Sequence, residues 1–141
     1  VSLTTNLHPD LGPVPLEPQR VRQVVLNLLR NAIEAAAEGG GRVTVTTRPT
    51  DAEASVQLIV ADTGPGFADD SPVFDAFYTT KDKGTGLGLA IVHRIVSEHG
   101  GTIHVASKTG ETQFTVEWPQ PASPSLSSPA SELEASRRLK P

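Results

Sequence analysis

Residues 84–99 read GTGLGLAIVHRIVSEH, a glycine-rich turn that continues directly into an amphipathic helix. Apolar residues recur at helical spacing from Leu87 to His99, and the pair Gly100-Gly101 then predicts the end of the helix. Backbone amides at a helix N-terminus bind anions, and glycines let a ligand approach the backbone closely. This stretch therefore predicts an anion-binding turn made by Gly84, Thr85, Gly86, Leu87 and Gly88.

The glycine spacing excludes the two common nucleotide-binding motifs. It is G-x-G-x-G rather than the dinucleotide pattern G-x-G-x-x-G, and no strand precedes it. A P-loop carries its lysine after the glycines, whereas Lys83 comes before Gly84. Because a glycine-rich turn alone specifies little, the segments around it decide its meaning.

Upstream lies a strand predicted over residues 55–61, apolar on both faces, followed by Asp62-Thr63-Gly64-Pro65-Gly66-Phe67. A carboxylate at the end of such a strand accepts a hydrogen bond from an exocyclic amine, and the glycines let the backbone approach a flat ring. The plainer alternative is an ordinary turn, since Asp-x-Gly is common turn chemistry.

Residues 17–38 have a helical pattern, with one broad apolar arc that Gly39-Gly40-Gly41 ends. Asn27 and Asn31 lie about 40° apart on this helix, at the edge of the arc. They present paired amide and carbonyl groups in one direction. A solvated polar edge is the alternative.

The segment Phe74–Lys81, FDAFYTTK, places three aromatic residues in a loop that runs from Asp62 to Gly84. Loops of this length in a compact domain are usually functional or disordered. The aromatics suggest anchors, and the hydroxyls and ammonium that follow suit phosphate oxygens. Alternatively, the aromatics only pack beneath a passive loop.

The remaining pattern predicts strands at residues 1–7, 42–47, 102–106 and 113–118, with a hairpin between 42–47 and 55–61. A connector spans Pro9–Pro18, a turn lies at Thr109-Gly110, and residues 119–141 form a flexible tail rich in Pro, Ser and Ala. Strands and helices mix without regular βαβ alternation, which favours an α+β sandwich.

Composition limits the classes of function. The 141 residues allow one domain, and the net charge of −4 argues against a nucleic-acid or anionic-membrane surface. No cysteine is present, so disulfides and thiolate metal sites are excluded. No apolar run is long enough to span a membrane, and we expect a soluble domain whether or not a longer parent protein is anchored.

Four segments in this order resemble the N, G1, F and G2 boxes of the histidine-kinase catalytic domain: QVVLNLLRNAIEA (23–35), DTGPGF (62–67), FDAFYTTK (74–81) and GTGLGL (84–89). That domain belongs to a larger family with gyrase, the Hsp90 chaperones and MutL. The resemblance covers residues 1–118, and the segment 74–81 is most similar to the nitrogen-regulation and oxygen-sensing branch. It implies a two-layer α/β sandwich of the Bergerat type, with a mixed, mostly antiparallel sheet, helices on one face and an ATP lid.

The resemblance also implies roles for individual residues. Asn31 would coordinate Mg²⁺ and act in catalysis together with Lys81, and Asn27 would lie beside the triphosphate of ATP. Asp62 would bind the adenine amino group. The other implied contacts are Gly64 and Gly66 at the base, Phe74 and Phe77 as lid anchors, and Tyr78, Thr80, Lys81, Gly84, Thr85, Gly86, Leu87 and Gly88 at the phosphates. Ala76 departs from the family pattern, which often has proline there, and this implies a slightly looser anchor.

The implied activity is transfer of the γ-phosphoryl group of Mg²⁺-ATP to a histidine on a separate dimerisation and phosphoacceptor domain in the cytoplasm, with a response regulator as the indirect partner. Asn27 stands where ATP-hydrolysing relatives carry a glutamate base, which favours transfer over hydrolysis. None of the four histidines lies in a phosphoacceptor-like segment, so we expect a monomer that binds ATP without autophosphorylating. The alternatives are a serine kinase of the anti-sigma-factor type, against which FDAFYTTK argues, and a degenerate nucleotide-binding module.

Overall fold

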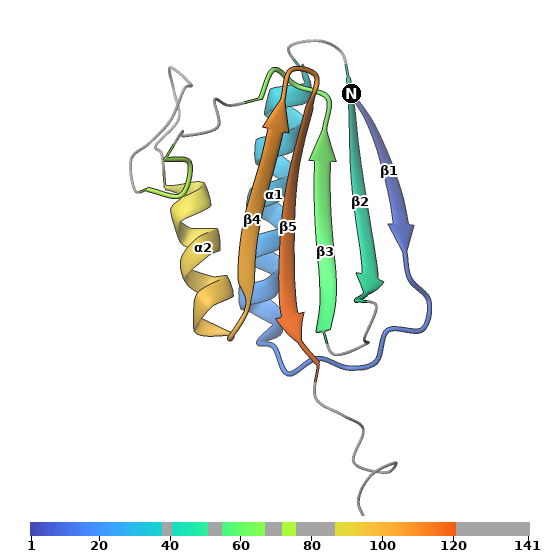
Figure 1. The fold of residues 1–141 in the computed structure, drawn as a ribbon, viewed down its shortest axis with the longest axis vertical. Coiled ribbons are helices and arrows are strands. Elements are labelled where there is room, and N and C mark those ends of the chain that lie inside the picture. Colours follow the sequence, from blue (N-terminus) through green and yellow to red (C-terminus); the bar gives the residue numbers. More distant parts are fainter. Residues whose placement is uncertain (38–40, 51–54, 67–71, 76–86, 121–141) are drawn as a thin grey trace, which may run out of the picture.

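The computed structural model of the chain describes residues 1–37, 41–50, 55–66, 72–75 and 87–120. These residues form five strands and two helices (Figure 1). In chain order they are β1 (Ser2–Leu7), α1 (Pro18–Ala37), β2 (Arg42–Pro49), β3 (Ser55–Asp62), α2 (Gly88–Glu98), β4 (Thr102–Lys108) and β5 (Glu111–Pro119). Each element predicted from the sequence is present, and its ends differ from the predicted ones by at most two residues.

The five strands form one mixed sheet in the order β1-β2-β3-β5-β4. β1 pairs with β2 in parallel, and the other three pairs are antiparallel. The hairpin between β2 and β3 is confirmed by the pairing of Val43 with Asp62 and of Pro49 with Val56. The sheet is therefore mostly antiparallel, and the expected α+β fold is confirmed.

Both helices lie on one face of the sheet, behind the strands in the view of Figure 1. Each helix joins two strands that run in the same direction: α1 connects β1 to β2, and α2 connects β3 to β4 across the intervening β5. Both crossovers run from the β1 edge of the sheet towards the β4 edge. The strands β1 and β2, however, are antiparallel to β3 and β4. The crossovers therefore have opposite hands, and the arrows in Figure 1 show that β1–α1–β2 is the left-handed one, against the usual preference.

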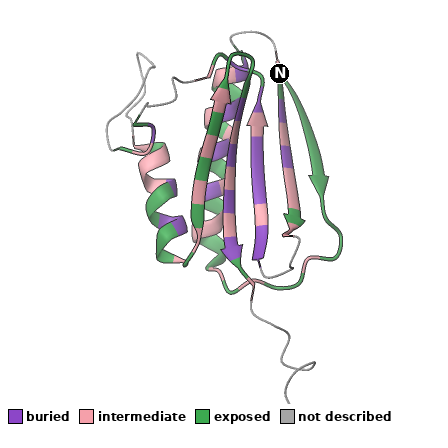
Figure 2. Ribbon diagram, in the orientation of Figure 1, coloured by how far each residue is buried: buried purple, intermediate pink, exposed green. Residues whose placement is uncertain are grey.

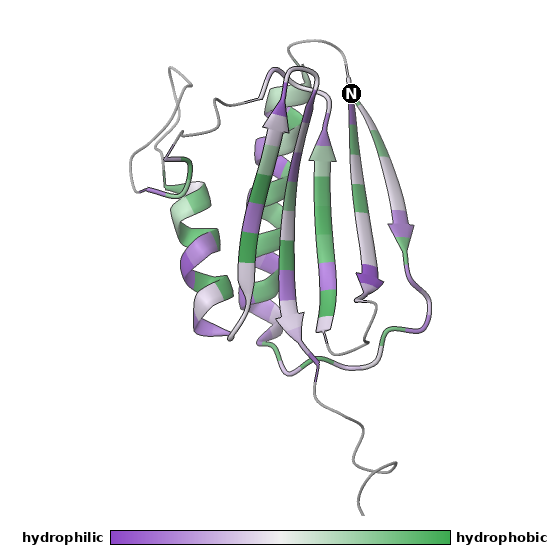
Figure 3. Ribbon diagram, in the orientation of Figure 1, coloured by the Kyte–Doolittle hydropathy of each residue, from purple (hydrophilic) through white to green (hydrophobic). Residues whose placement is uncertain are grey.

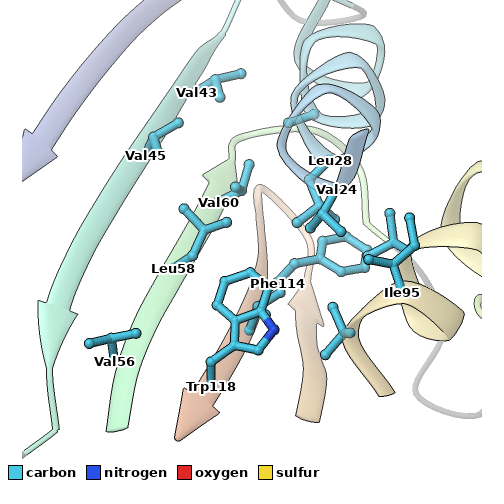
Figure 4. Close-up of a cluster of buried hydrophobic side chains, with 14 of the residues drawn as sticks. Val24, Leu28, Val43, Val45, Val56, Leu58, Val60, Ile95, Phe114 and Trp118 are labelled. Carbon is cyan, nitrogen blue, oxygen red and sulfur yellow. The ribbon is translucent and has the colours of Figure 1, made fainter. Parts of the chain in front are cut away.

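The core lies between the helices and the sheet (Figure 4). β5 alternates strictly, and its inward residues Phe114, Val116 and Trp118 are buried. β3 is the most continuously hydrophobic and buried strand (Figures 2 and 3), because it lies at the centre of the sheet. Even Ile59, on the face without helices, is buried. β1, at the edge, is exposed along its whole length.

Glycines end both helices as predicted. Gly41 donates its amide to the carbonyl of Ala36 (2.9 Å), and Gly101 donates to Val96 (2.9 Å) after Gly100 adopts φ +77°. A side chain at position 101 would contact Trp118, so this turn also makes room for the only tryptophan. The ring N–H of Trp118 is buried and has no hydrogen-bond partner among the described residues.

Several sequence predictions concern residues outside the described ranges. They include the lid residues Phe77 and Ala76 and the tail from residue 121 onward. The predicted end of the folded domain at residue 118 is not tested either, although β5 continues to Pro119. Neither described helix has the length and hydropathy needed to cross a membrane.

Candidate functional site

Asp62 is the last residue of β3, and its side chain lies on the sheet face that the helices cover, in register with Val43 of β2. Only 3% of Asp62 is exposed. One carboxylate oxygen accepts the backbone amide of Gly64 at 2.8 Å. Because this bond closes a tight turn directly after the strand, it fixes the carboxylate at the inner end of β3.

The glycines after Asp62 are required by packing within the protein. A Cβ at Gly64 would lie 2.7 Å from the carbonyl oxygen of Ala35, so the turn presses against the backbone of α1. Gly66 has φ +83°, and a Cβ there would lie 3.0 Å from the carbonyl oxygen of Lys108. The turn is therefore held between α1 and the β4–β5 hairpin.

Thr112 is a buried neighbour of Asp62 that the sequence analysis did not single out. It pairs with Asp62 in the register of β3 and β5, lies on the same face, and is 3% exposed. Its hydroxyl is 2.9 Å from that of Ser107. The alternation of residues 112, 114, 116 and 118 puts Thr112 on the inward face and was the available signal, but the pairing with Asp62 depends on which strands are neighbours.

Asn27 and Asn31 are half-buried on the side of α1 that faces α2. The amide of Asn27 donates to the carbonyl oxygen of Gly88, the first residue of α2, at 3.3 Å. Asn31 lies one turn further along α1, between this contact and the contact of Ala35 with the Gly64 turn. The structure thus places the start of α2, the predicted asparagine pair and the turn after Asp62 one after another along the C-terminal half of α1.

The N-terminus of α2 has properties that favour an anion. Leu87 is its N-cap residue and provides no side-chain cap, and its carbonyl accepts the amide of Ile91 at 2.9 Å. The first turn contains no acidic residue. A Cβ at Gly88 would meet no atom within 4 Å. The first turn therefore adds no negative charge at the positive end of the helix dipole, where backbone amides favour an anion.

Phe74 connects the segment before α2 to the core. Its ring lies 6.1 Å from that of Phe114 in an edge-to-face arrangement and 5.4 Å from that of His93 on α2. Val73 beside it is buried, although nothing in the sequence marked it. The other predicted phosphate-contacting residues lie outside the described ranges: Tyr78, Thr80, Lys81, Gly84, Thr85 and Gly86.

Residues 16–122 match the model of the family described as histidine kinase-, DNA gyrase B- and HSP90-like ATPase. The chain belongs to this family. Among curated members, the sensor histidine kinase ZraS of Escherichia coli (strain K12) is 39% identical over 120 residues, which cover 84% of this chain and 25% of ZraS. The sensory histidine kinase/phosphatase NtrB of Azospirillum brasilense is 42% identical over 125 residues, 79% of this chain and 31% of NtrB.

Solved structures of family members have the same fold. The nucleotide-free catalytic domain of histidine kinase ThkA matches with a TM-score of 0.73 and 33% identity, over 84% of this chain and 80% of that domain. Full-length ShkA in complex with AMPPNP matches with a TM-score of 0.74 and 34% identity, over 87% of this chain and 27% of ShkA. The chain thus spans about a quarter of ZraS, about a third of NtrB and most of the isolated catalytic domain of ThkA.

Proposed function

We propose that this chain is the ATP-binding catalytic domain of a sensor histidine kinase. It binds Mg²⁺-ATP and donates the γ-phosphoryl group to a histidine on a separate phosphoacceptor domain. The observation that carries the proposal is that the N-terminus of α2, the asparagine pair and the turn after the buried Asp62 follow one another along residues 27–35 of α1.

Asp62 would bind the adenine. A buried carboxylate whose oxygen already accepts the Gly64 amide is fixed in place, and its charge makes it a strong acceptor for an exocyclic amino group. Thr112, its neighbour across the sheet, adds a hydroxyl that both donates and accepts. The base would therefore lie against the turn formed by Gly64 and Gly66.

The phosphates would lie beside the N-terminus of α2, where the dipole and backbone amides favour anions. Asn31 would hold the Mg²⁺ ion through its side-chain oxygen, in agreement with the preference of this ion for oxygen ligands. When bound, Mg²⁺ neutralises charge on the phosphate oxygens. Lys81, Tyr78, Thr80, Thr85 and the glycines 84 and 86 would complete these contacts.

The proposed reaction is transfer rather than hydrolysis. An asparagine side chain does not accept a proton at neutral pH, so Asn27 cannot activate water as a general base. Its amide instead holds α1 against Gly88, which keeps the phosphate-binding end of α2 next to the asparagine pair. Phosphoryl transfer needs positioning and charge neutralisation more than covalent chemistry, and these residues supply both.

The setting follows from the same proposal. The domain would act in the cytoplasm with a phosphoacceptor domain as its partner and a response regulator downstream, and as an isolated chain it would be monomeric. The first curated relatives are sensor kinases of the histidine type, which favours this reading over a serine kinase.

Calorimetric titration of Mg²⁺-ATP tests the proposal. Asp62→Asn should weaken binding about 10- to 100-fold, because it removes a charge-assisted hydrogen bond worth about 1.5–3 kcal/mol. Asn31→Ala should remove most of the Mg²⁺ dependence. Asn6→Ala, an asparagine exposed on the edge strand β1, is the matched control and should bind as the parent does.

Folding of each variant is checked by circular dichroism. Absence of binding in the unmodified chain would contradict the proposed function. Binding that is indifferent to both Asp62→Asn and Asn31→Ala would retain a nucleotide-binding domain but overturn the assignment of the site.

A further inference from the structure

Among the described residues, the exposed large hydrophobic side chains belong to two parts of the chain. They are Val1, Leu3, Leu7, Leu26 and Ile33, and all of them lie on α1 or at β1. Leu3 is 54% exposed, Leu26 is 50% and Ile33 is 41%. Isolated exposed leucines are ordinary, but an apolar patch of this kind marks a surface that binds something.

The register shows how the two elements contribute. Leu3 pairs with Val43, a core residue, so it lies on the sheet face that carries the helices. Neither of the two described helices covers this face at β1 (Figure 1). On α1, Leu26 and Ile33 lie on the flank opposite to Asn27, which faces α2. We call Leu3, Leu26, Leu29 and Ile33 the α1–β1 surface.

The spacing on α1 has the form of a helix-packing seam. Leu26, Leu29 and Ile33 follow one another at intervals of three and four residues, and Leu29 is partly buried while the other two are exposed. This seam borders the row that packs on the sheet, whose members are Val24, Leu28, Ala32 and Ala36, and Leu29 contacts that core as well. A second seam on the same helix fits a partner that is itself a helix.

Charge restricts the partner further. Arg22 and Arg30 are exposed and flank the seam, and no ion pair among the described residues includes either of them. A second copy of α1 packed antiparallel about Leu29 would bring the Arg30 side chains together, which is unfavourable. A helix with acidic residues beside its apolar stripe would instead pair with both arginines.

We propose that the α1–β1 surface binds an amphipathic helix with acidic flanks, contributed by the part of the full-length kinase that lies outside this chain. The proposal rests on the proposed function, and the matched kinases are three to four times longer than the region shared with this chain. Docking there leaves the nucleotide end of the molecule open, because Asn27 and Asn31 are on the other side of α1.

Thiol labelling tests the proposal directly, because the chain contains no cysteine. Leu26→Cys and Ile33→Cys variants are alkylated in the isolated chain and in the full-length protein, and the modified peptide is quantified by mass spectrometry. We expect at least 10-fold slower alkylation in the full-length protein at both positions. Gln23→Cys, exposed on the same helix but off the seam, should react equally in both.

Adding Arg22→Gln and Arg30→Gln to the Leu26→Cys full-length protein should return its alkylation rate most of the way to that of the isolated chain. Equal rates in the isolated and full-length proteins would overturn the proposal. Slowing that appears in the isolated chain and grows with its concentration would assign the surface to a second copy instead. Mg²⁺-ATP titration of the isolated parent chain and its cysteine variants distinguishes failure of the docking proposal from failure of the proposed function. Absence of ATP binding in the parent chain would refute only the kinase function.

Discussion

Gly64 is required by packing at the position where we propose that the adenine base binds. The turn after Asp62 reaches the backbone of α1 only because position 64 has no side chain, and the Asp62–Gly64 hydrogen bond depends on that approach. Gly64→Ala should lower the free energy of unfolding by about 1–3 kcal/mol through overpacking. Urea denaturation measures this change. Gly88→Ala, where a Cβ meets nothing within 4 Å, is the control and should lose no stability.

A second prediction at the residue scale concerns the outer face of the sheet. The Ser55 hydroxyl donates to Glu117 at 2.6 Å and Gln57 donates to the other oxygen at 3.1 Å, and these bonds lower the pKa of Glu117 below its usual value of 4.5. Because the pKa of Glu117 is lower in the folded state, its ionised carboxylate stabilises the fold above pH 4.5. This contribution is lost as the pH falls through the pKa of the folded state. Ser55→Ala should therefore cost about 1 kcal/mol at pH 7.

The cost of Ser55→Ala should shrink as the pH falls below 4.5, because Glu117 then becomes protonated in both folded and unfolded chains. Thermal unfolding from pH 7 to pH 3 measures this. A difference between parent and variant that stays constant over the range would contradict the assignment of the pKa shift to the Ser55 hydroxyl.

Residue identity pointed to some members of the candidate site and not to others. Asp62, Asn27 and Asn31 stood out because a carboxylate ending a buried strand and a pair of amides on one helix edge are chemically distinctive. Thr112 and the contact between Gly64 and Ala35 did not, because both depend on which distant segments meet. The local sequence does not show which distant segments become neighbours.

At the scale of elements, His99 joins the two helices. Its Nδ1 lies 2.8 Å from the carbonyl oxygen of Ile95 at the end of α2, and its Nε2 accepts the amide of Glu17 at 3.4 Å, just before α1. The ion pair of Arg20 with Glu98 lies beside it. This end of α2 is opposite to the end where Asn27 contacts Gly88, so both ends of α2 are tied to α1 or to the residue before it.

His99→Ala should lower the free energy of unfolding by about 1–2 kcal/mol, because it removes two hydrogen bonds from a mostly buried side chain. His99→Gln, which retains an acceptor and a donor, should lose less. Chemical denaturation gives both values. Equal losses in the two variants would show that shape, rather than hydrogen bonding, holds the joint.

The helices and strands themselves were predictable because the periods of their apolar residues differ. The parallel pairing of β1 with β2 and the left-handed crossover through α1 were not predicted. The usual rule favours the right-handed form, and no local pattern in residues 1–49 signals the exception. The pairing is fixed by the sheet as a whole, in which β3 already has β2 and β5 as neighbours.

At the scale of the whole molecule, the fold closes with β5. Pro119 pairs with Ser55, and the amide of Gln120 contacts the carbonyl oxygen of Pro13 at 3.5 Å. We predict that a chain ending at Gln120 keeps the melting temperature and the Mg²⁺-ATP affinity of the full sequence. Residues 121–141 are rich in Pro and Ser, and their only large apolar residues are three leucines. Calorimetry of both chains measures the two quantities, and a melting temperature lowered by several degrees would contradict the domain boundary.

The position of Trp118 has a spectroscopic consequence. It is the sole tryptophan, it is 4% exposed, and it packs where β5 meets the turn that ends α2. An indole shielded from water emits at shorter wavelength than a hydrated one, so the native domain carries its own fluorophore at the end of the sheet remote from Asp62. Its red shift during denaturation will report separation of the helical layer from the sheet, and nucleotide bound beside Asp62 should leave the emission wavelength nearly unchanged.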